Sequence, residues 1–318
     1  MKLRHKWLQF FGGLSGVSVK NKEWLNLLEE DTRHSLMIEG FFIDKRELRE
    51  IIQNKKQGSK AYKVLGYFDA AVFSYEFAFQ QYKTDEFALS KSLIRQIHAL
   101  MFRNDPQFQY TPGDWRHGSI TIAGSKVDPP EYHKVEREID RLISFLNEIE
   151  ADPVRKAAIA HAVFEQIHPF PDGNGRVGRI LLNFILVASG FPNVAIKGES
   201  EEERKEYVKV LEEADERVSN VLRGKMAYSG LLQRPLVGLE DLINKNLAVA
   251  IDSVICGRFR EQTGHDLLPV NEVAKFMGKN VDSFRVACSQ KKIICQKMSG
   301  RLMTHPFLLE GPKRSGRA

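Results

Sequence analysis

Apolar residues recur at steps of three and four along most of this chain, and this period restricts the chain to a helical fold. The period covers residues 23–223 and belongs to amphipathic helices rather than strands. The segment 134–149 is an example, with apolar side chains at Val135, Ile139, Leu142, Ile143, Leu146 and Ile149. A further helix is expected over 153–167, because Asp152 can cap its first turn and Pro153 suits its first position.

The chain has 318 residues, which corresponds to roughly two domains. The helical period breaks between Met226 and Pro235, where Gly224 and Gly230 also interrupt the pattern, so a domain boundary is expected there. The predicted division comprises N-terminal helices at 1–60, a helical core at 61–232 and a small α+β domain at 235–318.

Positive charge is concentrated toward the C-terminal end. The whole chain has 47 Lys and Arg against 41 Asp and Glu, a net charge of +6. Residues 235–318 hold 13 basic against 8 acidic residues, so +5 of that charge lies there. An ordinary solvated basic face and a nucleic-acid-binding surface both fit this distribution, and a motif is needed to separate them.

The sequence predicts a cytoplasmic protein that does not span a membrane. No apolar run approaches the ~20 residues that a membrane span needs. No signal-peptide cleavage site follows the short apolar stretch near the N-terminus. The three cysteines, Cys256, Cys288 and Cys295, form no C-x-x-C pair, so neither a disulfide framework nor a zinc finger is expected.

A glycine-rich turn between two apolar helices carries most of the chemistry. The first helix is expected to end at His168, because Pro169 disfavours the helical conformation in the residue before it. The second helix begins near Asn174. The backbone N–H groups of the turn lie at the positive end of the second helix, which suits the turn to phosphate binding.

Four side chains beside this turn fit the transfer of a phosphate group from a nucleotide. Arg176 and Arg179 are three residues apart, so both project from one side of the helix and can bind phosphate oxygens. Asp172 can hold Mg²⁺. His168 can accept a proton from an incoming hydroxyl, since histidine ordinarily titrates near neutral pH. These residues alone do not separate adenylyl transfer from other phosphate transfers.

The run His168–Arg179 resembles the H-P-F-x-D/E-G-N-G-R-x-x-R motif of the Fic family. The resemblance extends over about 20–232 and implies the Fic-type helical core with its short β-hairpin flap. Fic proteins mostly transfer AMP from ATP to a Ser, Thr or Tyr hydroxyl of a target protein and release pyrophosphate. The resemblance therefore implies ATP as substrate, Mg²⁺ as cofactor and a target protein as partner. A kinase-like branch of the family has lysine where this chain has Gly175, so Gly175 favours AMP transfer.

The family roles transfer to this motif residue by residue. The resemblance makes His168 the general base and Phe170 the anchor of the loop in the core. The residues implied in nucleotide binding are Asp172, which would hold Mg²⁺ on the α- and β-phosphates, the anion hole at Gly173, Asn174 and Gly175, and the phosphate ligands Arg176 and Arg179. Arg179 would pair with the γ-phosphate and so fix the orientation of ATP.

Two more segments acquire a role through the resemblance. Residues 118–124 alternate β-branched residues between glycines, which predicts a short hairpin; in Fic proteins such a flap docks a target segment by strand addition. Its docking residues would be Ser119, Ile120, Thr121 and Ile122. Tyr207 resembles a family tyrosine near the adenine, although a half-exposed helix tyrosine also fits. His34, His117 and His161 lack the spacing of metal ligands and are interpreted as structural.

An inhibitory element is expected N-terminal to the core. Ser35 to Gly40 resembles the S/T-x-x-x-E-G/N signature of class II Fic proteins, in which Ser35 holds the helix and Glu39 pairs with Arg179 in place of the γ-phosphate. Taken alone, the same residues describe an ordinary helix end closed by glycine. In some relatives the glutamate positions water for AMP removal, so de-AMPylation and the use of another nucleotide remain alternatives.

The C-terminal quarter is expected to form a winged-helix-like domain. Two short helices flank Gly278, and two strands follow around Ser299–Gly300. The residues available for a small core are Val273, Phe276, Phe284 and either Val286 or Ala287. The domain would contact DNA through Lys279, Arg285, Lys291 and Lys292, or would instead serve protein contact or a homodimer. A DNA-binding regulator with an ATP-sensing site is the alternative function from another class.

Overall fold

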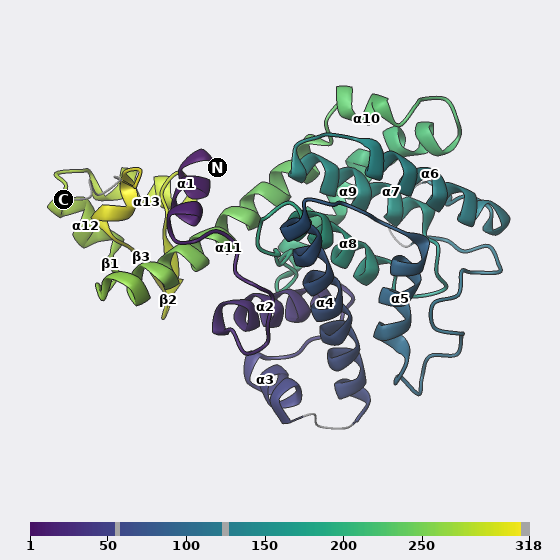
Figure 1. Cartoon of the computed structure of the whole chain (residues 1–318), viewed down its shortest axis with the longest axis horizontal. Coiled ribbons are helices and arrows are strands. Elements are labelled where there is room, and N and C mark those ends of the chain that lie inside the picture. Colours follow the sequence, from purple (N-terminus) through teal and green to yellow (C-terminus); the bar gives the residue numbers. More distant parts are fainter. Residues whose placement is uncertain (55–57, 123–126, 313–318) are drawn as a thin grey trace. The chain divides into compact units, whose positions relative to one another are not determined.

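A computed structural model describes residues 1–54, 58–122 and 127–312, and helices make up most of them (Figure 1). The α-helices are α1 (Lys2–Phe10), α2 (Lys22–Ile38), α3 (Lys45–Asn54), α4 (Ser59–Thr84), α5 (Lys91–Phe102), α6 (Val135–Glu148), α7 (Pro153–Ile167), α8 (Asn174–Ala188), α9 (Glu201–Leu222), α10 (Ser229–Gln233), α11 (Val237–Thr263), α12 (Val270–Phe276) and α13 (Val281–Ser289). The strands are β1 (Leu268–Pro269), β2 (Gln296–Met298) and β3 (Arg301–Thr304), and two 3₁₀ turns cover Tyr132–Lys134 and Pro306–Leu309. The mainly α fold expected from the sequence is confirmed.

The chain divides into two compact units. One unit comprises Gly16–Asn244, and the other combines Met1–Ser15 with Lys245–Ala318. The border therefore lies inside α11 rather than at Met226–Pro235, and the first helix belongs to the C-terminal unit rather than to an N-terminal segment 1–60.

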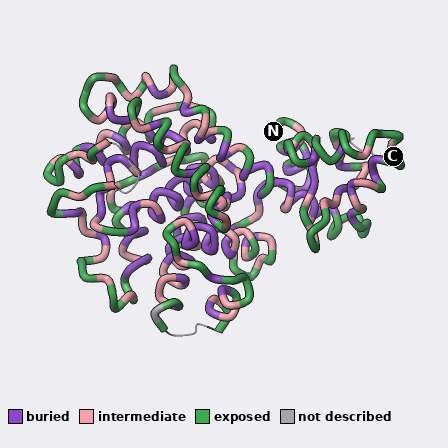
Figure 2. Tube along the Cα trace, turned by 180° about the vertical axis from the view of Figure 1, so that it is seen from behind, coloured by how far each residue is buried: buried purple, intermediate pink, exposed green. Residues whose placement is uncertain are grey.

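Helix α8 forms the centre of the larger unit. Nearly every residue of α8 from Asn174 to Val187 is buried, because the helix is mostly apolar and packs against α7, α4, α5 and α2 (Figure 2). Helix α7 is buried to a similar extent. These two central helices flank the glycine-rich turn, so the turn is held between the most rigidly packed elements of the unit.

Local capping signals explain where the helices of this unit begin. Asp152 accepts hydrogen bonds from the N–H groups of Val154 and Arg155 and starts α7, as predicted. Ser200 and Glu203 form a reciprocal capping box at the start of α9. The predicted helices over 134–149 and 153–167 are therefore confirmed as α6 and α7, within one residue at each end.

The expected flap is only partly described. Residues 118–122 lie in a segment without regular secondary structure, so the strand predicted there is not formed in the described part of the flap. Residues 123 and 124 of the expected hairpin lie outside the described residues. Alternating β-branched residues do not make a strand by themselves, because a strand also needs a paired neighbour.

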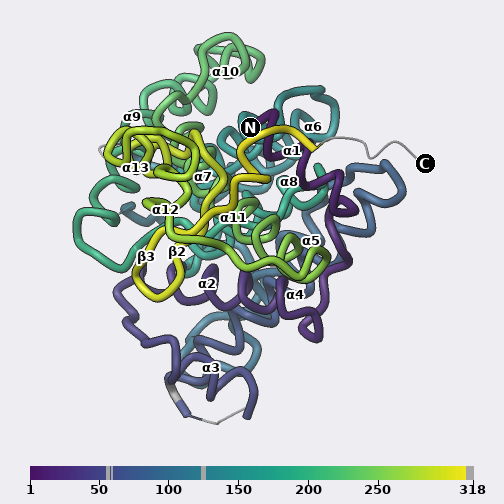
Figure 3. Tube along the Cα trace, turned by 90° about the vertical axis from the view of Figure 1, so that its left-hand side faces the viewer, coloured from purple at the N-terminus to yellow at the C-terminus, as the bar shows by residue number. Residues whose placement is uncertain are grey.

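The C-terminal unit contains the two helices and the two strands that the sequence predicts. Helices α12 and α13 are followed by the β2–β3 hairpin (Figure 3), and β1 pairs with the other edge of β3, giving the antiparallel order β1-β3-β2. Ser299 and Gly300 both have positive φ, 47° and 79°, as a tight hairpin turn requires.

The core of this unit differs from the prediction at Phe276. Val273 and Phe284 are buried together with Val270, Ala274, Cys288 and Cys295. Phe276 is 81% exposed, so the prediction that it contributes to the core is wrong. Of the two alternatives at 286 and 287, Val286 is 52% exposed and Ala287 is half-buried. Cys288, four residues after Phe284 on α13, and Cys295 complete the core.

Helix α1 is attached to the C-terminal unit by buried polar contacts. Arg4 pairs with Asp252 through two hydrogen bonds of 2.8 and 2.9 Å and also donates to backbone carbonyls of Lys291 and Ile293. The indole N–H of Trp7 donates to the carbonyl of Glu310. Among the described residues, no helix has the length and apolar character needed to cross a lipid bilayer.

Candidate active site

The turn between α7 and α8 begins at His168, which caps α7 in the left-handed conformation with φ 50°. A non-glycine residue is uncommon there and needs support from its surroundings. Arg116 gives that support, since its Nε donates to the carbonyl of His168 at 2.9 Å and its backbone N–H donates to that of Pro169. Phe170 then enters the core, where its ring stacks on His98 at 3.9 Å, as an anchor of the loop should.

The side chain of Asn174 holds the turn closed. Its amide donates to the carbonyl of Phe170 and its oxygen accepts from the Phe170 N–H, both at 2.8 Å. Gly173 has φ 82°, and a Cβ there would approach the Phe102 ring to 2.6 Å, so only glycine fits. The backbone N–H groups at the start of α8 are consequently fixed in place.

The imidazole of His168 is oriented by α7. Its Nδ1 lies 3.0 Å from the carbonyl oxygen of Glu165, which is only an acceptor, so Nδ1 carries the proton and Nε2 is left as the basic nitrogen. Burial lowers the pKa of His168, the bond to the Glu165 carbonyl opposes that change, and nearby Arg116 adds to it. A neutral imidazole with a free Nε2 is the form that a general base requires.

Asp172 lies at the exposed edge of the turn. Its Oδ1 accepts from the Gly173 N–H at 2.5 Å and from the Arg176 guanidinium at 3.1 Å. Arg176 is buried against the Phe102 ring, and its guanidinium carbon lies 4.9 Å from the ring centroid. Arg176 therefore contacts Asp172 but does not line the cavity that His168 lines. This position differs from the one expected of a residue that binds phosphate in that cavity.

Arg179 is buried in the unit and is shared by three helices. From α8 its Nε donates to Ser35 Oγ at 2.7 Å, and its Nη2 donates to the Ser35 carbonyl at 3.0 Å and to Glu39 Oε1 at 2.6 Å. Its Nη1 lies 3.4 Å from the Tyr207 hydroxyl of α9. Burial alone would lower the pKa of Arg179, but Tyr207, Glu39 and Tyr67 raise it above its ordinary value.

Glu39 follows the last residue of α2 and turns into the site. Burial alone would raise its pKa, but the charge of Arg179, with a further contribution from Arg176, lowers it. A Cβ on Gly175 would lie 2.6 Å from Glu39 Oε1 and 3.1 Å from Arg179 Nη1. Glycine at 175 thus leaves room for the carboxylate beside the first turn of α8.

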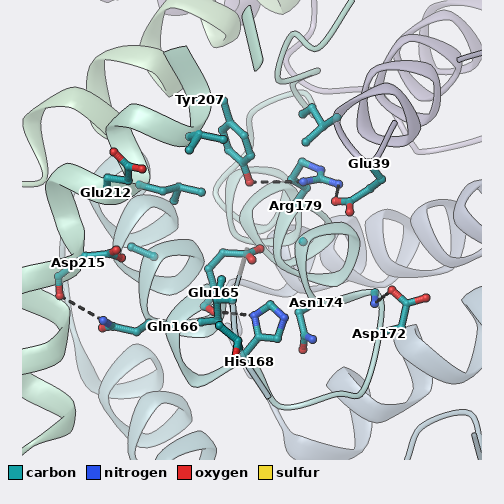
Figure 4. Close-up of a pocket in the computed structure, with 18 of the residues that line it drawn as sticks. Glu39, Glu165, Gln166, His168, Asp172, Asn174, Arg179, Tyr207, Glu212 and Asp215 are labelled. Atoms are coloured by element: carbon teal, nitrogen blue, oxygen red, sulfur yellow. Dashed lines mark hydrogen bonds and ion pairs between the residues drawn. The ribbon is translucent and has the colours of Figure 1, made fainter. Parts of the chain in front are cut away.

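One cavity of about 430 Å³ brings most of the predicted site residues together, and this volume is typical of small-molecule sites (Figure 4). The predicted residues that line it are Glu39, Thr121, Ile122, His168, Asp172, Gly173, Asn174, Gly175, Arg179 and Tyr207. Ser35 contacts Arg179 from behind the cavity, whereas Ser119 and Ile120 of the expected flap do not line it. Tyr207 is buried rather than half-exposed.

Three residues of the site lie outside the sequence prediction or were given only a structural role. Asp31 of α2 is buried and accepts from the hydroxyls of Tyr67 at 3.1 Å and Tyr75 at 2.6 Å, which fixes α2 to α4. His161 Nε2 lies 2.7 Å from the Tyr207 hydroxyl. Glu165 lines the cavity between His168 and Arg179 (Figure 4). Glu165 follows His161 by four positions, so both lie on one face of α7, and His168 follows at the end of that helix.

The described residues suit a metal ion only in company with a nucleotide. Across residues 1–54, 58–122 and 127–312, no group of three or more His, Cys, Asp or Glu is arranged to hold a metal. Asp172 offers one carboxylate beside the N–H groups at the start of α8, and its Oδ2 is not used in the hydrogen bonds to Gly173 and Arg176. Mg²⁺ is commonly held by one or two carboxylates together with substrate phosphates, and this arrangement fits that pattern.

Comparison with known proteins identifies relatives of this chain. A model of the Fic/DOC family matches residues 88–186. A probable protein adenylyltransferase of Aquifex aeolicus is 33% identical over 305 residues, which cover 90% of this chain and 88% of the relative. A protein adenylyltransferase Fic of Culex quinquefasciatus is 31% identical over 190 residues, covering 57% of this chain and 36% of the relative.

Solved structures share the fold. A Fic-domain-containing signaling protein of Bacteroides thetaiotaomicron has a TM-score of 0.62 at 21% identity, covering 83% of this chain and 97% of that one. Fic-1 of Caenorhabditis elegans, residues 134–508, has a TM-score of 0.60 at 24% identity, covering 82% of this chain and 72% of that one.

Proposed function

This chain belongs to the Fic/DOC family, and from its adenylyltransferase relatives and its cavity we propose that it moves AMP from ATP to a Ser, Thr or Tyr hydroxyl of a target protein. The observation that carries the proposal is the placement of a basic imidazole nitrogen on His168, the anion nest at 173–175 and the Arg179 guanidinium in one cavity. A binding group for a phosphate chain and a base for an attacking hydroxyl are the two parts that such a transfer needs.

His168 acts as the general base. Its Nε2 takes the proton of the target hydroxyl while the hydroxyl oxygen bonds to the α-phosphorus of ATP. The bond from the α-phosphorus to the oxygen that bridges the α- and β-phosphates breaks, and pyrophosphate leaves. The carbonyl of Glu165 keeps the proton on Nδ1 and so maintains the basic nitrogen toward the cavity.

Arg179 and the anion nest orient the triphosphate. The N–H groups at the start of α8 hold the phosphates beside His168, and Arg179 binds the γ-phosphate at the far end. An in-line attack depends on this orientation, because the leaving pyrophosphate must point away from the target hydroxyl. Asp172 would hold Mg²⁺ against the phosphates, and the bound ion would neutralise charge that develops on the leaving group.

Glu39 holds the enzyme in check. Its carboxylate occupies the Arg179 contact that the γ-phosphate needs, at 2.6 Å. Ser35 keeps the end of α2 against the same guanidinium. ATP that binds without this contact presents its α-phosphate in an unsuitable orientation, so transfer is slow until Glu39 moves away.

The target segment binds beside residues 118–122. Thr121 and Ile122 line the cavity, and their segment has no strand pairing among the described residues, so its backbone groups are available to an extended target segment. Ser119 and Ile120 continue this docking edge away from the cavity.

The C-terminal unit provides a separate contact surface. Lys279, Arg285 and Lys292 are exposed around α13, and Lys291 is half-buried. Basic side chains beside a helix–turn–helix suit DNA phosphates. A gel shift that disappears on charge reversal at Lys279 and Lys292 supports DNA contact; a dimer in solution without a shift favours the protein-contact alternative.

Transfer from ATP labelled at the α-phosphate tests the proposal. We expect little label on the wild type, strong label on Glu39→Gly and none on Glu39→Gly combined with His168→Ala. Label in a cell lysate, followed by mass spectrometry, identifies the target and the modified hydroxyl. Equal label with and without His168 contradicts the proposal, and release of AMP from a labelled target by the wild type indicates the de-AMPylation alternative.

A further inference from the structure

Glu165 places a carboxyl group in the cavity, and only its backbone carbonyl, which holds His168, has a role in the proposed transfer. Its side chain is 15% exposed and lies between His168 and Arg179 on the cavity wall (Figure 4). No cationic side chain forms a salt bridge with it in the described structure apart from a 3.8 Å approach of His161, and its Oε1 is buried without a hydrogen-bond partner there. A carboxylate in this position, beside a triphosphate, would repel the substrate.

The two oxygens of Glu165 have different surroundings. Oε1 is buried, lies 3.8 Å from His161 Nδ1 and has no hydrogen-bond partner among the described residues. The side chain nevertheless lines the cavity and is 15% exposed, so Oε2 is the oxygen that a bound nucleotide can reach.

The charges around Glu165 favour its neutral form. Burial raises the pKa of Glu165 to about 8; Arg179 opposes this change and Glu39 adds to it. The other titratable neighbours are uncharged, because burial lowers the pKa of His161 to about 3, raises that of Tyr207 and lowers that of His168. Arg179 is the one cation facing Glu165 among these groups, and it is already paired with Glu39.

We propose that Glu165 binds the nucleoside triphosphate as a neutral carboxylic acid, donating the proton on Oε2 to an oxygen of the nucleotide. The inference rests on the proposed function, since it places that substrate in this cavity. A phosphate or ribose oxygen in front of Oε2 accepts the proton, while the buried Oε1 stays beside His161. Nucleotide affinity must then fall when Glu165 ionises, because the donor is lost and a negative charge faces the phosphates.

Nucleotide binding at several pH values tests this assignment. The ligand is α,β-methylene-ATP, which cannot release pyrophosphate, with Mg²⁺, and calorimetry measures its affinity for the wild-type chain, which keeps Glu39 and Arg179 beside Glu165. A single group with a pKa of about 8 that must hold its proton gives about a tenfold loss of affinity between pH 7 and pH 9. Glu165→Gln keeps a donor and cannot ionise, so it should bind within about threefold of its parent at pH 7 and lose the alkaline fall.

Two further variants separate the possible explanations. Glu165→Leu removes the donor and should weaken binding at pH 7 about fivefold, the effect of one neutral hydrogen bond. Glu212→Gln, on an exposed carboxylate at the rim of the same cavity, should keep the alkaline fall.

The outcomes distinguish the inference from the proposed function. An equal fall in the parent and in Glu165→Gln overturns the inference, and so does a parent whose affinity does not change up to pH 9. Failure of the parent to bind the analogue at every pH contradicts the proposed function instead.

Discussion

Exchanging Glu39 for glutamine measures how much of the inhibition is electrostatic. Glutamine keeps the shape of the side chain and removes the charge that faces Arg179 at 2.6 Å. The Arg179 side chain is 2% exposed and that of Glu39 is 38% exposed, so the pair lies between a buried and a surface ion pair. Surface pairs contribute about 0–1 kcal/mol and hydrogen bonds to buried charges about 1.5–3 kcal/mol. We therefore expect the charge of Glu39 to contribute about 1–2 kcal/mol.

That contribution predicts the gain in activity. Since about 1.4 kcal/mol is a factor of ten, Glu39→Gln should transfer AMP about 5–30 times faster than the wild type. Glu39→Gly removes both charge and bulk and sets the upper limit. The assay is the initial rate of labelling from ATP labelled at the α-phosphate, and Glu150→Gln, at an exposed glutamate, is the control that should leave the rate unchanged.

Two results would refute the electrostatic reasoning. The first is a silent Glu39→Gln beside an active Glu39→Gly, which would mean that the bulk of the side chain blocks the site. The second concerns pH. Arg179 outweighs burial and lowers the pKa of Glu39, so Glu39 stays ionised and paired with Arg179 at every pH above the ordinary glutamate pKa. The ion pair is lost only when the pH falls well below that ordinary value. The rate ratio of glutamine variant to wild type should thus stay constant from pH 8 to pH 6, and a ratio that approaches one at pH 6 would be inconsistent with the ion pair.

Three further substitutions test the supports of the site. Burial raises the pKa of Asp31 to about 7, above its ordinary 3.8. The free energy of unfolding of the wild type, measured in urea, should therefore fall by about 2–3 kcal/mol from pH 5 to pH 8 relative to that of Asp31→Asn. The same difference between the two proteins at both pH values would exclude this. Asn174→Ala removes both hydrogen bonds to the Phe170 backbone and should lower the free energy of unfolding by about 2–4 kcal/mol, measured in urea, with no change contradicting the role of the clamp. Asp172→Asn should raise the Mg²⁺ concentration needed for half-maximal transfer at least tenfold, and an unchanged titration would remove Asp172 as the metal ligand.

The turn from His168 to Arg179 could be predicted from the sequence because its functional groups are contiguous. A proline that ends one helix, glycines in the turn and a helix start are local signals, and their side-chain directions follow from helical spacing. The contact of Glu39 with Arg179 could be predicted only through the family resemblance, since 140 positions separate the partners. Composition or period alone cannot bring two such distant residues together.

Residues whose role depends on tertiary burial were harder to predict. Asp31 looks like a surface acid on an amphipathic helix until the hydroxyls of Tyr67 and Tyr75 cover it. Glu165 could have been noticed as a lone acid in the apolar helix 157–167. Its lack of a hydrogen-bond partner at Oε1 depends on α8, which packs across it and which the sequence does not place there. Phe276 shows the opposite case, because it lies off the α12 face that buries Val273 and Ala274, and Met277 packs against the core instead.

In the proposed mechanism, the burial of Arg179 makes inhibition and substrate binding depend on the same contact. A guanidinium buried to this extent would be costly without partners, so it must remain hydrogen-bonded whether or not a nucleotide is present. The contacts of Arg179 with Ser35 and Tyr207 remain when Glu39 moves away. The contact with Glu39 comes from a half-exposed side chain that can turn toward solvent. Glu39 can therefore be exchanged for a phosphate oxygen without unpairing the arginine. In the proposed mechanism, Glu39 and the γ-phosphate would compete for one position on a cation that keeps its hydrogen bonds throughout.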